Sequence, residues 1–123
     1  MDALGASLIE GLEDAVVVTD GALSVVAWNA VMERLTGVGR GAALGRPAAD
    51  VLDFLRDADV TAHLSRALAG ETSATGDVRY ELTGETRGGW IAARYVPWRD
   101  EGGAIGGVVG FHTVVTERHR RGM

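Results

Sequence analysis

Three histidines are the side chains of this sequence best suited to acid–base or metal chemistry near neutral pH. They are His63, His112 and His119, and their positions do not show the spacing of a metal-binding motif. The chain has no cysteine, which excludes a thiolate nucleophile, a disulfide, a zinc–thiolate site and a thiol adduct to a cofactor. All twelve basic residues are arginine, so Schiff-base chemistry and a phosphate-loop lysine are excluded as well.

The acidic pairs and the glycines offer no catalytic arrangement either. Asp57/Asp59 and Asp100/Glu101 fall at an expected helix start and an expected turn, where carboxylates need no catalytic role. The glycines from position 37 onwards miss the G-x-G-x-x-G spacing of a dinucleotide site, and neither G-x-S-x-G nor H-E-x-x-H occurs. The sequence therefore predicts a domain that is not itself an enzyme.

Size and charge narrow the class of protein further. The chain has 123 residues, of which 46% are hydrophobic, and this suits one compact domain. A net charge of −5 disfavours a nucleic-acid partner, because such partners call for a concentrated basic surface. No apolar run approaches the roughly 20 residues that cross a bilayer, and no leader opens the chain. We therefore expect a cytoplasmic protein without membrane insertion.

The histidines and aromatic residues must be positioned by a sheet, whose clearest part runs from Arg87 to Glu117. Two β-rich arms flank the acidic, glycine-rich turn Asp100–Gly103, which predicts an antiparallel hairpin. Alternation puts Ile91, Ala93 and Tyr95 on one face of the first arm, with Trp90, Ala92, Arg94, Val96 and Trp98 on the other. The two tryptophans predict that the second face is also covered.

The rest of the chain predicts an α+β domain. Leucines at positions 4, 8 and 12 predict an amphipathic helix over residues 2–13, which we expect to cover the Trp90/Trp98 face. The further elements are a hairpin over 15–20 and 24–28, a helix capped by Asn29 and stopped at Gly37, a loop over 37–53 with a short helix after Pro47, a helix over 57–69, a loop to Gly76 and a strand over 77–82. This order predicts a five-stranded antiparallel sheet with helices against one face and the N-terminal helix on the other.

Several segments together resemble a PAS domain, the sensory module of many bacterial histidine kinases and other signalling proteins. They are N-A-V-M-E-R-L-T-G at 29–37, L-G-R-P at 44–47, P-W-R-D-E-G-G at 97–103, I-G-G-V-V-G at 105–110 and T-E-R at 116–118. The resemblance covers residues 14–118. It implies an N-terminal capping and dimerisation helix over 1–13 and the start of an output linker over 119–123.

The resemblance implies an internal pocket between the helices and the inner face of the sheet. Its ligand-binding residues would be Val17, Thr19, His63, Leu64, Ile91, Ala93, Tyr95, Val108, Gly110 and His112. For His112 the alternative is a side chain turned to solvent by strand twist; if it faces inward, a ligand, a water or Thr19 could be its hydrogen-bond partner. Glycines at 106, 107 and 110, with Ala93, suggest room in the interior.

The resemblance leaves the cofactor open. The flavin photoreceptor branch needs an adduct-forming cysteine that this chain lacks, and Ile91 stands where that branch carries an amide. The heme branch uses a histidine on the helix corresponding to 57–69, and His63 lies on that helix. The number of residues between His63 and Gly70 is smaller than expected for an iron ligand. We therefore expect a partly buried polar residue at His63 rather than a heme ligand. We also expect no metal site.

The function implied is a sensor domain, with a histidine kinase as the expected parent protein. It would bind a small molecule and relay the change to a C-terminal effector domain. The alternatives are a ligand-free homodimerisation module with a filled core and a heme-based gas sensor. A homodimer would use Leu4, Leu8, Leu12, Trp90, Val96 and Trp98. Relatives commonly end in Asp-Ile-Thr-Glu-Arg, but Val114 replaces the aspartate here, which puts the usual coupling to the output helix in doubt.

Overall fold

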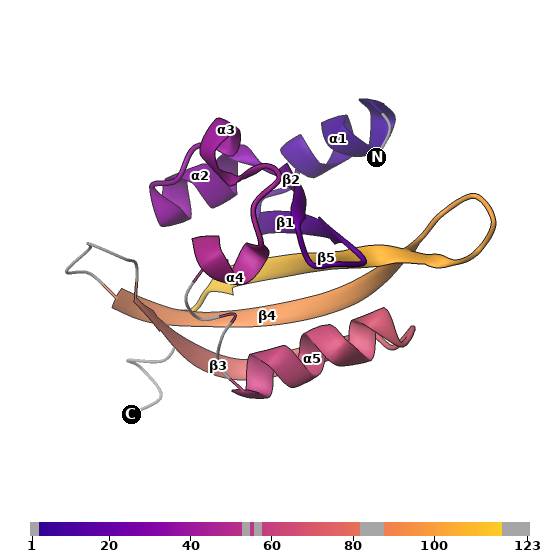
Figure 1. Ribbon diagram of the computed structural model, residues 1–123. Helices are drawn as coiled ribbons and strands as arrows, with labels where there is room; N and C mark the ends of the chain where they lie inside the picture. Colours follow the sequence, from indigo (N-terminus) through magenta and orange to yellow (C-terminus); the bar gives the residue numbers. More distant parts are fainter. Residues whose placement is uncertain (1–2, 53–54, 56–57, 82–87, 117–123) are drawn as a thin grey trace.

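The computed structural model describes residues 3–52, 55, 58–81 and 88–116 and shows one antiparallel sheet with helices around it (Figure 1). The sheet has five strands in the order β2-β1-β5-β4-β3. The strands are β1 (Ala15–Asp20), β2 (Val25–Trp28), β3 (Ser73–Glu81), β4 (Gly88–Arg99) and β5 (Ile105–Val114). The predicted α+β class and five-stranded antiparallel sheet are confirmed. No helix among the described residues is long and apolar enough to span a membrane.

Strands β4 and β5 form the long hairpin that the sequence predicts. The Asp100 carboxylate accepts hydrogen bonds from the backbone amides of Gly102 and Ala104, at 2.9 and 3.0 Å. Gly103 has a φ of 85°, a left-handed conformation that glycine adopts without a steric penalty. These local bonds close the turn and align the two strands.

The first hairpin and the helix after it are also set by local chemistry. Asp20 caps the β1–β2 turn by accepting from the amides of Ala22 and Ser24. Helix α2 (Ala30–Thr36) begins after Asn29, whose side chain accepts from the amide of Met32, and ends at Gly37 with a φ of 74°. The predicted cap and the predicted stop of this helix are both confirmed.

The segment between α2 and β3 differs from the prediction at two places. The expected loop contains a short helix, α3 (Arg40–Ala43), before the expected one after Pro47, α4 (Ala48–Val51); helix α5 (Ala58–Leu68) follows. Strand β3 starts at Ser73 instead of 77, because the register shifts between Ala74 and Asp77 and Thr75 Oγ1 bonds to the backbone of Ala93. A bulge of this kind breaks the strict alternation that marks a strand in sequence. Leu82, the last residue of the expected strand, lies outside the described residues, as do Asp57 and 117–123.

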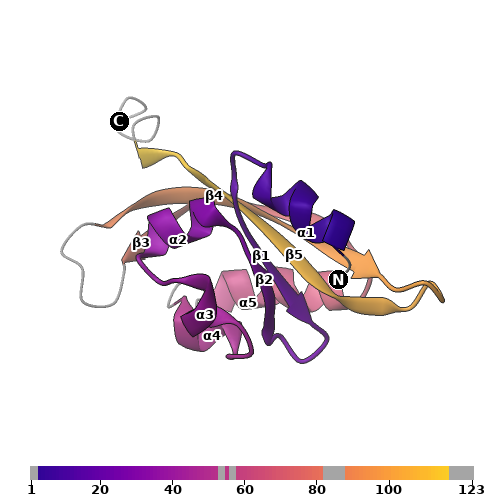
Figure 2. The ribbon, with the colours of Figure 1, turned by 90° about the horizontal axis from the view of Figure 1, so that it is seen from above.

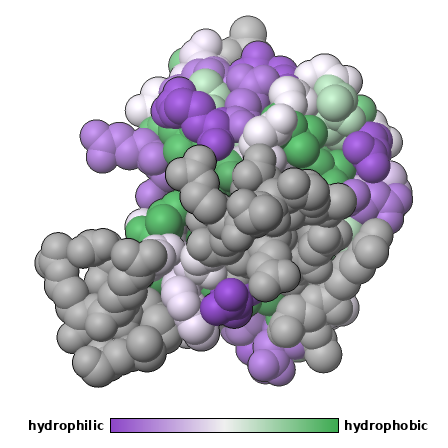
Figure 3. Space-filling model, turned by 90° about the vertical axis from the view of Figure 1, so that its left-hand side faces the viewer, coloured by the Kyte–Doolittle hydropathy of each residue, from purple (hydrophilic) through white to green (hydrophobic). Residues whose placement is uncertain are grey.

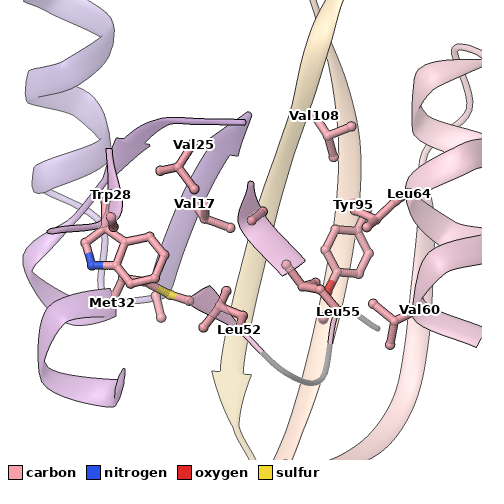
Figure 4. Packing of buried hydrophobic residues seen from close by; sticks show 14 of the residues in the cluster. Val17, Val25, Trp28, Met32, Leu52, Leu55, Val60, Leu64, Tyr95 and Val108 are labelled. Atoms are coloured by element: carbon pink, nitrogen blue, oxygen red, sulfur yellow. The ribbon is translucent and has the colours of Figure 1, made fainter. Parts of the chain in front are cut away.

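The core lies between the inner face of the sheet and helices α2, α4 and α5. Figure 4 shows Trp28, Met32 and Val17 at one end, and Tyr95 with Leu64, Leu55 and Val60 at the other. On helix α5, Val60, Leu64 and Ala67 are buried, and Leu68 is partly buried against the same core. The core therefore fills one side of the sheet from β2 to β3.

Helix α1 (Ala3–Glu10) lies beside the β1–β2 hairpin (Figure 2), and its last residues, Ile9 and Glu10, share a cleft with β2 and with Arg40 of α3. Its attachment differs from the prediction. Leu4 and Leu8 are 69% and 63% exposed, whereas Gly5 and Ile9 are half-buried. The leucines therefore do not cover the Trp90/Trp98 face within one chain. The sequence identifies an apolar stripe on the helix but does not say which partner covers it.

Trp98 on the outer face is packed by its own sheet. Its Nε1–H donates to the carbonyl of Thr19 at 2.8 Å, so the indole crosses β5 to reach β1. A Cβ at Gly106 would lie 2.3 Å from the indole, and one at Gly107 would lie 1.9 Å from the Thr19 carbonyl oxygen. These two glycines make room for the tryptophan and for close strand approach, which corrects the prediction that they leave space in the interior.

Candidate functional site

Residues predicted to contact a ligand meet in rows that run across the inner face of the sheet. Strand pairing places Trp28, Val17, Gly110, Tyr95 and Ser73 opposite one another, one from each strand in sheet order. Residues directly opposite in paired strands point to the same face. The next row holds Ala15, His112 and Ala93, and the row on the other side joins Thr19 to Val108. Ile91 is also buried on this face.

Tyr95 and His112 form a hydrogen-bonded pair at the centre of these rows. The Tyr95 hydroxyl lies 3.1 Å from His112 Nε2, and the two rings meet edge to face with centroids 5.6 Å apart. His112 Nδ1 lies 3.1 Å from the carbonyl oxygen of Ala15, which can only accept. Nδ1 is therefore the protonated nitrogen, and Nε2 accepts from the tyrosine hydroxyl. His112 is 1% exposed, so the inward prediction is confirmed over the solvent-facing one.

Burial determines the protonation states of this pair. It lowers the pKa of His112 from 6.5 to about 4; the bond to the Ala15 carbonyl and the nearby Asp14 charge oppose this effect without cancelling it. Burial also raises the pKa of Tyr95 above its ordinary value. Both groups are thus neutral near neutral pH. The pair provides a hydrogen bond inside the core and no charge.

The helix α5 residues of the predicted site approach the same tyrosine. The His63 ring is stacked on the Tyr95 ring with centroids 6.4 Å apart and planes 29° apart. Its Nδ1 lies 2.7 Å from Ser73 Oγ on β3, and Leu64 is buried nearby in the core. His63 is half-buried, as expected of a polar residue at the core edge. The sequence did not indicate Ser73 as its partner, because Ser73 fell in a predicted loop.

Gly110 allows the two aromatic rings to meet. A Cβ at this position would lie 3.0 Å from a ring carbon of Tyr95 and 3.0 Å from a ring carbon of His112. The space expected above Gly110 is therefore filled by Tyr95 itself. Thr19, the other expected partner of His112, instead donates to the carbonyl of Asp20 at 3.0 Å.

Asn29 is a functional candidate that the sequence showed only as a helix cap. Its side chain is fully buried; Oδ1 accepts from the amides of Val16 and Met32. Its Nδ2 donates to the carbonyls of Ile9 and Asp14, at 3.1 and 2.9 Å. One amide thus joins α1, β1 and α2. The ion pair between Arg40 and Glu10 adds a second link to the end of α1.

The described surface has shallow clefts. One, of about 260 Å³, lies between α5 and β3 and is lined on the helix by Asp59, His63 and Arg66. On the face in Figure 3, hydrophilic and hydrophobic side chains are interspersed over the described part. Within the described ranges no three metal-ligating side chains lie close enough to hold an ion.

The fold, the buried core and the sequence segments described above all agree with one family. The family described as PAS fold matches residues 9–120. The chain belongs to the PAS family. It is a PAS sensor domain, as the segments over 29–37 and 97–110 predicted.

Solved PAS structures overlay on nearly the whole domain. A PAS domain from Colwellia psychrerythraea is 26% identical, with 95% of this chain and 100% of that one covered and a TM-score of 0.76. An RNA-binding light-oxygen-voltage receptor is 24% identical with a TM-score of 0.78; the match covers 97% of this chain and 34% of the receptor. The PAS domain of histidine kinase ThkA is 21% identical over 82% of this chain and 98% of that one, with a TM-score of 0.61. No curated protein matches the chain.

The residues of this PAS domain do not fit flavin adduct chemistry. The chain has no cysteine to form the bond. On the inner face, the Tyr95 ring lies over Gly110, and Ile91 is a buried aliphatic residue without a hydrogen-bonding group. What the arrangement offers is a buried polar pair, Tyr95 and His112, in contact with His63 and Gly110 at the centre of the apolar core.

Proposed function

We propose that this PAS domain is a homodimeric signal-relay module in the cytoplasm of a larger signalling protein. A histidine kinase is the parent class that its sequence motifs suggest, with a C-terminal effector domain as the recipient of the signal. The observation that carries the proposal is the exposed leucine stripe on α1, a helix whose other face is fastened to the domain.

The leucine stripe is suited to a second copy of the same helix. Leu4 and Leu8 lie one turn apart on α1, and Leu12 follows with 41% of its surface exposed. Burial of exposed aliphatic side chains lowers the free energy by roughly 25 cal/mol per Å² of apolar surface removed from water. A symmetric pair of α1 helices would cover the stripe of each chain with that of the other.

The attachment of α1 supports a role in relay. Asn29 bonds to both ends of the α1–β1 connection, at Ile9 and Asp14, and His112 bonds to Ala15 at the start of β1. A shift in the core would therefore reach the residues that hold α1. In a dimer the position of α1 would in turn affect the partner chain.

A test of the dimer is sedimentation velocity on the wild type and on Leu8→Glu. The wild type should sediment as a dimer at micromolar concentration, and Leu8→Glu as a folded monomer. Ala62→Glu is the control, because it introduces the same charge at an exposed position of α5, a helix that lies against β3, β4 and β5. A monomeric wild type, or a Leu8→Glu variant that remains dimeric, would contradict the proposal.

The second candidate function is small-molecule sensing in the interior. It is favoured by the hydrogen-bonding groups of Tyr95 and His112, which are buried beside Gly110, where a ligand could replace one of them. A native mass spectrum distinguishes the two functions. A dimer without added mass agrees with the relay module, whereas additional non-covalent mass in each chain would favour the sensor.

A further inference from the structure

The two edge strands of the sheet differ in how their outer sides are covered. On β2, Val25 donates its amide to the carbonyl of Arg46 and accepts from the amide of Gly45. Arg40 Nε donates to the carbonyl of Trp28 on the same strand. Strand β3 is the opposite edge of the sheet, and within the described ranges its strand partner is β4 alone. Edge strands are the places where a sheet can add a further strand.

The bonds of β4 show which of its backbone groups are directed to β3. The amide of Trp90 donates to Thr116 Oγ1 and its carbonyl accepts from the amide of Val115, both on the β5 side. The amide and the carbonyl of Ala93 both bond to Thr75 Oγ1, on β3. Backbone groups alternate in direction along a strand. The odd-numbered residues of this part of β4 therefore face β3, and the even-numbered ones face β5.

The register of β3 then shows which of its own backbone groups are directed outward. Val78 is opposite Ile91, so its amide and carbonyl are directed to β4. Asp77 and Arg79 are opposite even-numbered residues of β4. Their amides and carbonyls are therefore directed away from β4, to the outer edge of the sheet. The side chains of Asp77 and Arg79 share the outer face of the sheet, since they lie two residues apart on one strand.

We propose that the outer edge of β3 is an interaction surface for the same edge of a second copy of this chain. The two strands pair antiparallel, with Val78 of one copy opposite Val78 of the other. In this register Asp77 of each copy lies opposite Arg79 of the other, and the residues of each such pair exchange both backbone hydrogen bonds. Their side chains point to the same face, where opposite charges attract. The two sheets become one continuous sheet.

The charges on β3 select this register over its neighbours. A symmetric pair centred on Asp77 would place two carboxylates directly opposite each other, and one centred on Arg79 would place two guanidinium groups opposite each other. Like charges in directly opposite positions are destabilising. Asp77 and Arg79 are exposed, whereas Val78 is half-buried against the core. Pairing centred on Val78 therefore also extends the apolar core across the seam.

The β3 edge and helix α1 lie at opposite ends of the sheet, because α1 lies beside the β1–β2 hairpin (Figure 2). Helix α5 contacts β3, β4 and β5, which places it over the face of the sheet. The β3 edge and the leucine stripe of α1 can thus be occupied at the same time. A symmetric interface at each end joins dimers into larger assemblies. The inference goes beyond the relay function and does not depend on the α1 dimer.

The test uses the full chain carrying Leu8→Glu, which changes the leucine stripe and leaves the β3 edge as it is. This chain should associate in sedimentation velocity at roughly 100 µM, well above the concentration at which the α1 contact is tested. Adding Arg79→Asp or Asp77→Arg should weaken the association by roughly 10-fold or more, because each places like charges opposite each other. An equimolar mixture of these two variants should associate again, since an arginine then lies opposite an aspartate at both positions.

Glu101→Arg in the same background is the matched charge reversal, because Glu101 is exposed in the β4–β5 turn; it should associate like its parent. Amide hydrogen exchange is the second readout. When half of the chains are paired, the amides of Asp77 and Arg79 should exchange about 2-fold more slowly, whereas the amide of Val78, already directed to β4, should not change.

Three results would overturn the edge pairing. They are a Leu8→Glu chain that stays monomeric at roughly 100 µM, single charge reversals on β3 that leave association unchanged, and a mixture of the two variants that does not associate. The α1 dimer is measured at micromolar concentration and with β3 intact. Failure of one proposal is therefore distinguishable from failure of the other.

Discussion

Protonation of His112 should make the stability of this domain depend on pH in a way that one variant can isolate. The folded chain holds His112 neutral, with a pKa of about 4, whereas an exposed histidine in the unfolded chain titrates near 6.5. Between these values the unfolded chain binds the extra proton. The free energy of unfolding therefore falls as the pH falls from about 6.5 towards 4.

The size of this effect follows from the two pKa values. Linkage from this single group lowers the free energy of unfolding by about 2 kcal/mol between about pH 7 and about pH 5, and by about 3 kcal/mol by about pH 4.

His112→Gln is neutral throughout this range and can still accept from the Tyr95 hydroxyl. It should be less stable than the wild type by about 1–3 kcal/mol at about pH 7, because the bond to the Ala15 carbonyl is lost. Its disadvantage should shrink or reverse by about pH 5.

The assay is urea unfolding followed by tryptophan fluorescence at several pH values, with the carboxylate contribution removed by subtracting the variant from the wild type at each pH. Tyr95→Phe is the control, because it removes the hydrogen bond between Tyr95 and His112 Nε2 but leaves His112 titratable. The pH dependence of its stability should follow that of the wild type. Parallel curves for wild type and His112→Gln would refute the reasoning, since they would show that burial of His112 has no effect on its protonation.

Two further predictions concern the attachment of α1 and the close approach of β1 and β5. Asn29→Asp keeps an acceptor for its amide partners but loses the Nδ2 donor to the carbonyls of Ile9 and Asp14. Amide hydrogen exchange in α1 should therefore become faster by roughly 5- to 100-fold. The melting temperature should fall less than it does in Asn29→Ala. Gly107→Ala should destabilise the fold by at least about 3 kcal/mol, because its Cβ would meet β1 backbone at 1.9 Å, whereas Gly41→Ala, with nothing within 4 Å, should be nearly neutral or stabilising in urea unfolding. Unchanged hydrogen exchange in α1 of Asn29→Asp would contradict the first account. Equal stability of Gly107→Ala and Gly41→Ala would contradict the second.

The elements that the sequence determined by itself are those set by neighbouring residues. Alternation in β4 identified Ile91, Ala93 and Tyr95 as one face, because side chains in a strand alternate whatever the strand pairs with. Asn29 and Gly37 marked the ends of α2 through bonds and dihedral angles within one turn. The lack of cysteine and lysine excluded whole classes of chemistry before any fold was known.

Short or irregular elements were beyond sequence reasoning for a related reason. Helix α3 is one turn long and rich in small residues, so it carries no hydrophobic period. The start of β3 is held by a bulge and by Thr75 bonding to the backbone of Ala93, contacts made with a strand far along the chain. The exposure of Leu4 and Leu8 likewise depends on how α1 is fastened, not on its own pattern.

The tertiary structure alone decided what the candidate site contains. In the sequence, Gly110 indicates a position without side-chain volume, and His112 indicates an imidazole that could face the core or the solvent. Only the β4–β5 register places Tyr95 over that glycine and within 3.1 Å of Nε2, so the expected space is filled by the chain itself. Residue types and their alternation are local properties of the sequence; which side chain fills a given space depends on the pairing of strands, and this is fixed only when the sheet assembles.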